Sequence, residues 1–317
     1  MKSIIKSAFI LIFLAFTLIA KSQNIFEEKQ KIFIVKNKIK SQTSYDYYYT
    51  NNKLSETGIK TSQIFYDKNG NITEIITYKK NDTLSREFIQ YDEDGKKIDY
   101  KKIIGNGIAY HKKYEYKDKD VIREYGFDGT NNFEIKYNYF SPGKLKEILY
   151  YTEKQLTEKR TFDHSKNQSE IKIEKPIGKI SSYIILNYDD KGNIIEEKTL
   201  DSQKQIIETK KYTYSNNLLF SEIKMRNNNI ISKTFYYYSS NGDLLEIWEE
   251  NAGEAKFLRK KFSYDDNGNL IKMEWRRNGN EQFSERTYKY NNQNLCIEYL
   301  TYYPITKFKV LTKFIYE

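Results

Sequence analysis

The chain has 317 residues, with 38% hydrophobic and 30% charged side chains and a formal net charge of +10 at pH 7. Its 30 Tyr and 18 Phe argue against intrinsic disorder, because so many aromatic side chains supply apolar surface for a folded core. A single Cys excludes an internal disulfide, and two His leave too few ligands for a zinc site. The Lys residues are interleaved with Glu and not clustered, so we expect no nucleic-acid partner.

Residues 1–22 have the pattern of a secretory signal peptide. Lys2 and Lys6 form a basic start, residues 8–20 are almost wholly apolar, and the small residues Ala20 and Ser22 precede a cleavage site before Gln23. The apolar run is shorter than the about 20 residues that a spanning helix needs, which disfavours the alternative of an anchor helix. We therefore expect export through the Sec system to the periplasm, the cell surface or the medium. Residues 23–44 are interpreted as an N-terminal cap.

The rest of the chain is organised around a seven-residue turn motif. It reads Tyr-Asp-Asp-Asn-Gly-Asn-Leu at residues 264–270 and recurs in near copies at residues 66–72 and 188–194. In such a turn the Asp side chain accepts hydrogen bonds from backbone N–H groups two residues on, and Gly takes the left-handed conformation that closes the loop. Alternating aromatic and β-branched residues flank each copy, so the motif predicts a β-hairpin.

An aromatic residue precedes each turn, and these anchor residues recur at a nearly constant spacing. After a first step of 17 residues, successive anchors are 23–26 residues apart. Such a period indicates a tandem array, here of about eleven units of roughly 25 residues with two strands each, in a single domain over residues 45–317. The anchors are Tyr49, Tyr66, Tyr91, Tyr116, Tyr139, Phe162, Tyr188, Tyr214, Tyr238, Tyr264, Tyr290 and Tyr316.

The Tyr-Asp-x-x-Gly core at residues 66–70, 91–95, 188–192 and 264–268, with Leu or Ile soon after the Gly, resembles the YD repeats of the RHS family. The resemblance covers nearly all of the mature chain. It implies a secreted bacterial protein built of tandem β-hairpins in a spiralling sheet, acting at cell surfaces.

Open twisted sheets of more than about ten strands curl or split. The sequence therefore predicts an all-β fold in which tandem antiparallel β-hairpin repeats form a long coiled or partly closed meander sheet. The strand near residues 309–316 is then expected to have an open edge that can pair with another chain. The oligomeric state is left open.

No group of residues indicates catalysis. His111 and His164 are two repeats apart, so no local motif brings either to a nucleophile. Residues 265–269 faintly resemble a calcium loop but lack its alternating ligands. We accordingly expect no catalytic residue, no metal and no cofactor. Four Glu each fall four residues after a turn Gly and are interpreted as a solvated ladder paired with Lys, not as a glycosidase pair. They are Glu74, Glu147, Glu196 and Glu246.

Aromatic side chains give the best indication of a function. Runs of adjacent Tyr place a ring on both faces of a strand, so one face is expected to carry exposed rings that stack on sugars or anchor protein partners. The alternative is that these rings fill the inside of the coil. The candidate binding residues are Tyr236, Tyr238, Trp248, Trp275 and Tyr302.

These observations favour a secreted, non-enzymatic repeat protein that binds a glycan, a cell-envelope component or a protein partner along an extended aromatic-rich surface. The second hypothesis is an outer-membrane β-barrel, which needs an uncharged outward band. The strands at residues 194–198 and 270–274 place Glu and Lys on one face and weaken that hypothesis. The third is an enzyme that acts on an envelope polymer.

Overall fold

The computed structural model describes residues 30–317, so the predicted signal peptide lies outside the described residues. A short helix over residues 30–36 precedes 23 strands. The strands are β1 Ser41–Thr50, β2 Lys53–Leu54, β3 Ile59–Tyr66, β4 Ile72–Lys79, β5 Asp82–Tyr91, β6 Lys97–Ile104, β7 Gly107–Lys117, β8 Asp120–Phe127, β9 Asn132–Ser141, β10 Lys144–Thr152, β11 Gln155–His164, β12 Gln168–Glu174, β13 Ile180–Tyr188, β14 Ile194–Asp201, β15 Ile206–Ser215, β16 Leu218–Arg226, β17 Asn229–Tyr238, β18 Leu244–Asn251, β19 Phe257–Tyr264, β20 Leu270–Trp275, β21 Ser284–Tyr290, β22 Cys296–Tyr303 and β23 Phe308–Tyr316.

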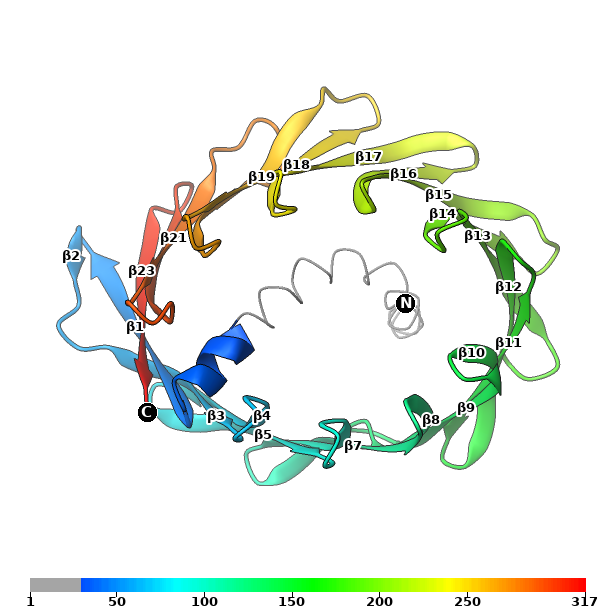
Figure 1. The fold of residues 1–317 in the computed structure, drawn as a ribbon, viewed down its shortest axis with the longest axis horizontal. Helices are drawn as coiled ribbons and strands as arrows, with labels where there is room; N and C mark the ends of the chain where they lie inside the picture. The colour runs from blue at the N-terminus through cyan, green and yellow to red at the C-terminus, as the bar shows by residue number, and fades with distance from the viewer. Residues whose placement is uncertain (1–29) are drawn as a thin grey trace.

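The sheet closes on itself. Each strand from β3 to β23 pairs antiparallel with the next, and β23 returns to β1 through pairs that run from Gln42 with Tyr316 to Tyr48 with Val310. The two-residue strand β2 pairs only with β1 and projects from the ring, which leaves 22 strands in a closed barrel (Figure 1). The prediction of a long coiled or partly closed meander is therefore wrong. Closure removes both unpaired edges, including the open edge predicted at residues 309–316.

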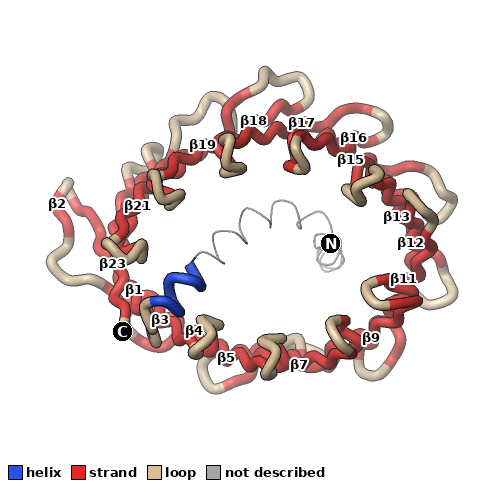
Figure 2. Tube along the Cα trace, in the orientation of Figure 1, coloured by secondary structure: helices blue, strands red, loops and turns tan. Residues whose placement is uncertain are grey.

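The turns follow the predicted mechanism. Asp67 Oδ1 accepts hydrogen bonds from the N–H groups of Asn69 and Asn71 at 2.8 and 2.9 Å, and Gly70 is left-handed with φ +74°. Asp189 and Asp265 make the same bonds in their copies of the motif. The prediction of an Asp-capped hairpin turn is confirmed. Figure 2 shows one set of turns inside the ring and the other set outside it.

Seven of the anchor Tyr residues tie two neighbouring hairpins together. In each of them the hydroxyl donates to a main-chain carbonyl 18–20 residues earlier, near the start of a strand in the preceding unit, at 2.7–3.1 Å. This bond explains why Tyr recurs with the period of the array. The donor–acceptor pairs are Tyr91–Ile72, Tyr116–Lys97, Tyr139–Val121, Tyr214–Ile194, Tyr264–Leu244, Tyr290–Leu270 and Tyr316–Cys296.

One predicted anchor is wrong. Phe162 has no hydroxyl, and the anchoring bond of its unit is made by His164, whose Nε2 donates to the carbonyl of Leu145 at 2.7 Å. His164 is also the last residue of β11, and the other units have their Tyr at or near this end of the strand. Its Nδ1 lies 2.8 Å from Ser169 Oγ, so both ring nitrogens are used in holding the wall together.

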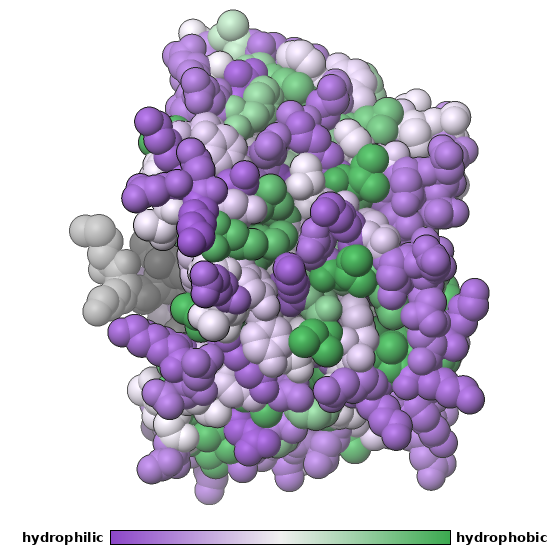
Figure 3. All heavy atoms as spheres, turned by 90° about the vertical axis from the view of Figure 1, so that its left-hand side faces the viewer, coloured by the Kyte–Doolittle hydropathy of each residue, from purple (hydrophilic) through white to green (hydrophobic). Residues whose placement is uncertain are grey.

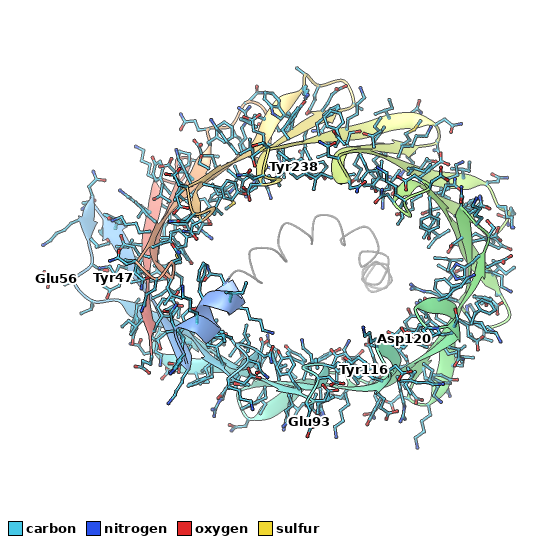
Figure 4. The ribbon with its side chains drawn as sticks, viewed as in Figure 1. Tyr47, Glu56, Glu93, Tyr116, Asp120 and Tyr238 are labelled. Atoms are coloured by element: carbon cyan, nitrogen blue, oxygen red, sulfur yellow. The ribbon has the colours of Figure 1, made fainter. Side chains whose placement is uncertain are left out.

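The two faces of the sheet are the inner and outer walls of the barrel. In Figure 4 the anchors Tyr116 and Tyr238 lie toward the inside of the ring and Tyr47 lies toward the outside. Tyr47 packs beside Gly58 in the loop that projects outward after β2. Because side chains alternate along a strand, the residues two and four positions before an anchor in its own strand share the inner wall with it, and those between them share the outer wall. In the other strands, the cross-strand partner gives the wall.

The apolar core lies on the inner wall between β9 and β19. Ile148, Ile184 and Leu186 are only 1–3% exposed, although no second layer of sheet covers them. Side chains on the concave face converge, so they bury one another. The helix over residues 30–36 also lies inside the ring, where Val35 and Lys31 pack against the turn at Gly70 (Figure 1).

Candidate binding surfaces

The inner wall carries Tyr–Glu–Lys triplets at repeated positions. Glu124 accepts hydrogen bonds from Lys112 Nζ at 2.6 Å and from the Tyr137 hydroxyl at 2.9 Å. Burial, with the nearby Glu124 carboxylate, raises the pKa of Tyr137 far above its usual value, so this hydroxyl remains a donor. Two further triplets have the same composition, namely Glu87 with Tyr100 and Lys102, and Glu197 with Lys210 and Tyr212.

The inner wall also holds a buried ion pair. Arg160 binds Glu158 through Nε and a terminal nitrogen, both at 2.7 Å, and the two residues are 5% and 6% exposed. The guanidinium lies 4.9 Å from the ring centroid of Tyr150, and Lys175 contacts the second carboxylate oxygen of Glu158 at 3.0 Å. Each charge has a partner, so this part of the wall presents no free acid or base, although the buried hydroxyl of Tyr150 has no hydrogen-bond partner among residues 30–317.

The outer wall is lined by exposed ion pairs. Glu74 pairs with Arg86, Glu147 with Lys159 and Glu196 with Lys198, at 2.6–3.2 Å. Although partial burial opposes it, hydrogen bonds from Asn138 and Lys159 hold the pKa of Glu147 below its usual value. The predicted pairing with Lys is confirmed for Glu147 and Glu196, whereas Glu74 pairs with an Arg and Glu246 accepts from Trp248 Nε1 at 2.7 Å. Figure 3 shows this wall over β1, β2 and β23 as mostly hydrophilic with scattered apolar groups.

An aromatic cluster interrupts the ion pairs on the outer wall of β16–β18. Phe235, Tyr237 and Trp248 surround the ammonium of Lys256, which lies 4.1–5.4 Å from the three ring centroids. A fourth ring, that of Phe220, packs against Phe235 and Tyr237. A cleft of ≈ 780 Å³ opens beside Trp248, between the loops at residues 252–256 and 276–283. A cleft of this size is within the range of small-ligand sites.

The structure divides the predicted binding residues between the two walls. Tyr236 and Tyr238 lie together on the inner wall, and Tyr236 is only 5% exposed, so the expectation that it is an exposed ring is wrong. Trp275 is also on the inner wall, where its ring centroid lies 5.9 Å from that of Tyr303. Trp248 and Tyr302 face outward on strands that are four apart. Of the five, Trp248 alone joins the aromatic cluster. The neighbouring Lys256 was missed because no pattern in the sequence indicates that it lies over the rings.

The ionisable groups that were considered for catalysis are used in structural contacts. His111 Nε2 pairs with the Asp99 carboxylate at 3.0 Å on the outer wall. Burial raises the pKa of the Cys296 thiol to about 12, so Cys296 behaves as a small buried apolar residue. Within residues 30–317, no group of three or more His, Cys, Asp or Glu could hold a metal ion.

Over the same residues the structure contains no helix that is long and apolar enough to cross a membrane.

Comparisons with known proteins give no family. No protein-family model matches the chain, and no curated protein matches it. Solved structures with detectable similarity include a porin-like protein from Bacteroides uniformis, with 8% identity and a TM-score of 0.33, over 88% of this chain and 96% of that one. A porin-like protein from Bacteroides vulgatus has 11% identity and a TM-score of 0.26, over 86% and 97% of the two chains.

The chain also matches a part of a larger protein. The crystal structure of TcdB2-TccC3-TEV has 11% identity and a TM-score of 0.27, over 82% of this chain, which spans 18% of that chain. All these TM-scores are below 0.5, so the assignment of the fold rests on the strand pairings alone. The pairing of β1 with β23 makes a closed barrel, and no family model supports the YD/RHS resemblance, which is therefore not retained.

Proposed function

We propose that the protein is a non-enzymatic β-barrel of the cell envelope that binds its partner through the outer-wall aromatic cluster. The observation that carries the proposal is the set of four clustered rings on the outer wall, one of which, Trp248, lines a cleft of ≈ 780 Å³. Rings of this kind stack on sugars and anchor protein partners. Because the sheet closes into a barrel, the predicted extended binding surface is replaced by a local site on the outer wall.

Closure supports an outer-membrane barrel as a second candidate. A sheet can span a bilayer only when it has no edge, and the 22 strands of this barrel have none. The outer wall bears on the same question, because Lys or Arg facing lipid near the midplane costs about 2–4 kcal/mol per residue. Arg86, Arg123 and Lys198 are among the outward cations in the strands. Closure thus favours the outer-membrane barrel over the predicted extended binding surface, and only the cost of the outward cations keeps a barrel surrounded by water as our first candidate.

The location is tested by expressing the full chain in a Gram-negative host and separating periplasm from membranes. A barrel that stays in solution without detergent, and is monodisperse in size-exclusion chromatography, supports the first candidate. A chain that resists carbonate extraction from outer membranes and migrates differently when unheated overturns it and supports the second.

Binding is tested separately by cosedimentation with peptidoglycan sacculi and with lipopolysaccharide. The first candidate predicts retention that Trp248→Ala reduces and that Tyr302→Ala, a second outward ring outside the cluster, leaves unchanged. Release of reducing ends from either polymer overturns the non-enzymatic assignment. Equal retention of both variants overturns the role of the cluster.

A further inference from the structure

Lys256 lies in a cage of aromatic rings. Its Nζ is 4.1 Å from the centroid of Phe235, 5.3 Å from that of Tyr237 and 5.4 Å from that of Trp248, and it donates to the Tyr237 hydroxyl at 2.9 Å. The face of an aromatic ring attracts a cation at distances up to about 6 Å. Three rings thus act on one ammonium group.

The number of rings around Lys256 distinguishes it from the other Lys residues of the outer wall. Lys198, Lys272 and Lys289 each pair with a Glu carboxylate, whereas Lys256 has no carboxylate partner among residues 30–317. Lys60 also lies over an aromatic ring, that of Tyr78 at 4.4 Å, but it contacts that ring alone. The cage around Lys256 is therefore a site for an ammonium group and not a by-product of the ion-pair ladder.

The position of Lys256 in the chain allows it to leave the cage. It is the last residue of the exposed loop at residues 252–256, just before the buried Phe257 begins β19. The rings, in contrast, are fixed in the wall, where Phe235 is the cross-strand partner of Trp248 and Tyr237 that of Glu246. Trp248 is further held by its hydrogen bond to Glu246 at 2.7 Å. Outward rotation of the Lys side chain empties the cage without breaking a strand pair.

The adjoining cleft provides room for the remainder of a ligand. It is lined by Trp248 and Lys256 together with Glu254 and Glu281. The other cation in the cleft, Arg276, is committed to the carbonyls of Leu258 and Gly279 at 2.7 Å each. With Lys256 displaced, the two carboxylates of the lining, Glu254 and Glu281, outnumber its one remaining cation, Arg276, so the cleft favours a ligand with positive charge.

We propose that this cage binds an alkylated ammonium group of an envelope ligand, and that Lys256 occupies it as a displaceable internal competitor. Aromatic cages recognise such cations through the ring faces, and the effect is strongest where water is excluded. The inference rests on the proposed binding role of the outer-wall cluster and specifies its ligand chemistry. It does not depend on where the barrel sits in the envelope.

The test uses the intrinsic fluorescence of Trp248, because the chain has only two Trp and Trp275→Phe leaves Trp248 as the sole reporter. Tetramethylammonium is titrated into this parent and into the same chain with Lys256→Ala. We expect at least tenfold tighter binding after Lys256→Ala, since the internal ammonium no longer competes. Phe235→Leu in the Lys256→Ala chain, which removes the nearest ring, is expected to reverse the gain.

Two controls separate the cage from other effects. Lys60→Ala, at the single-ring site, is expected to leave binding unchanged. The neutral isostere 3,3-dimethylbutan-1-ol is expected not to bind, because it has the shape of choline without the charge. Equal affinity in the parent and in Lys256→Ala, or equal binding of the isostere, overturns the inference. If the inference fails in this way but cosedimentation with the envelope polymers still depends on Trp248, the proposed function remains in place.

Discussion

The inner and outer walls of the barrel are built from the same strands but hold their charges in different environments. The Arg160–Glu158 pair on the inner wall has side chains that are 7% and 8% exposed, whereas Arg86–Glu74 on the outer wall has side chains that are 47% and 19% exposed. Both pairs have hydrogen-bonded geometry. The difference lies in the curvature, because side chains converge on the concave wall and diverge on the convex one.

This difference explains how a chain that is only 38% hydrophobic can fold without a second layer. On the concave wall, convergence buries Tyr rings and the stems of charged residues together with Ile and Leu. The hydroxyls and charges keep their partners, as in the Glu124–Tyr137 bond at 2.9 Å, so their burial is tolerated. On the convex wall the same residue types diverge and stay more exposed, so each ion pair contributes less to stability.

The largest expected effect is the contrast between two Arg substitutions. Arg160→Met leaves the Glu158 carboxylate buried with Lys175 as its remaining cation. Loss of one partner of a buried ion pair costs about 3–5 kcal/mol. Arg86→Met removes an exposed pair that is worth about 0–1 kcal/mol. Urea unfolding of the two variants measures the contrast, and equal losses of stability would show that curvature does not divide the walls.

An apolar pair of substitutions tests the same division without charge. Ile184 is 1% exposed on the inner wall, and Ile315 is 51% exposed on the outer wall. Ile184→Ala is expected to lower the free energy of unfolding by about 2–5 kcal/mol, through lost burial and a cavity. Ile315→Ala is expected to change it by within about 0.5 kcal/mol. A small loss for Ile184→Ala would mean that the inner wall is loosely packed.

The pairing of β1 with β23 is the seam that closes the barrel. Val310→Pro tests how much closure depends on this seam. Val310 pairs with Tyr48 on one side and Thr301 on the other, so Pro removes a ladder donor in an interior strand. The carbonyl left without a partner costs about 1–3 kcal/mol, and an opened edge promotes association of chains. Scattering and size-exclusion chromatography measure the opening. Val310→Thr, which keeps the N–H group, is the control and is expected to remain a closed monomer.

The local part of this fold could be predicted from the sequence, and its closure could not. Each Asp-containing turn is determined by residues within five positions, so the hairpins and their capping bonds follow from the pattern. The seam instead pairs Gln42 with Tyr316, which are 274 residues apart, and no local pattern specifies that contact. Closure depends on the twist and curvature summed over all the strands, which a period of about 25 residues does not specify.

The candidate site was predicted in part for a similar reason. Trp248 lies four residues after Leu244, but Trp275 lies five residues after Leu270, the equivalent position one unit later. That single-residue offset places the two Trp on opposite walls, because side chains alternate with a period of two. The offset is visible in the sequence when each Trp is counted from the Leu that follows its turn. It is not visible when the two Trp are compared only by their approximate place in the repeat. The loop conformation that brings Lys256 over the rings has no such signal.

The smallest effect concerns the anchor Tyr hydroxyls and sharpens the picture of the inner wall. Burial raises the pKa of Tyr66, Tyr214 and Tyr264 to about 12, from 10.0 for an exposed Tyr. A raised folded-state pKa means that the folded chain retains protons that the unfolded chain loses above pH 10. The stability linked to these groups is thus complete below pH 10 and falls as the pH rises from 10 to 12. Alkaline unfolding, followed by phenolate absorbance at 295 nm, should occur in this window.

Tyr264→Phe should lower the stability at pH 7 by about 0.5–1.5 kcal/mol, through loss of the hydrogen bond to the Leu244 carbonyl, and should make the stability less sensitive to alkali. Unchanged stability at pH 7 would show that the recurring Tyr is selected for its ring and not for its hydroxyl.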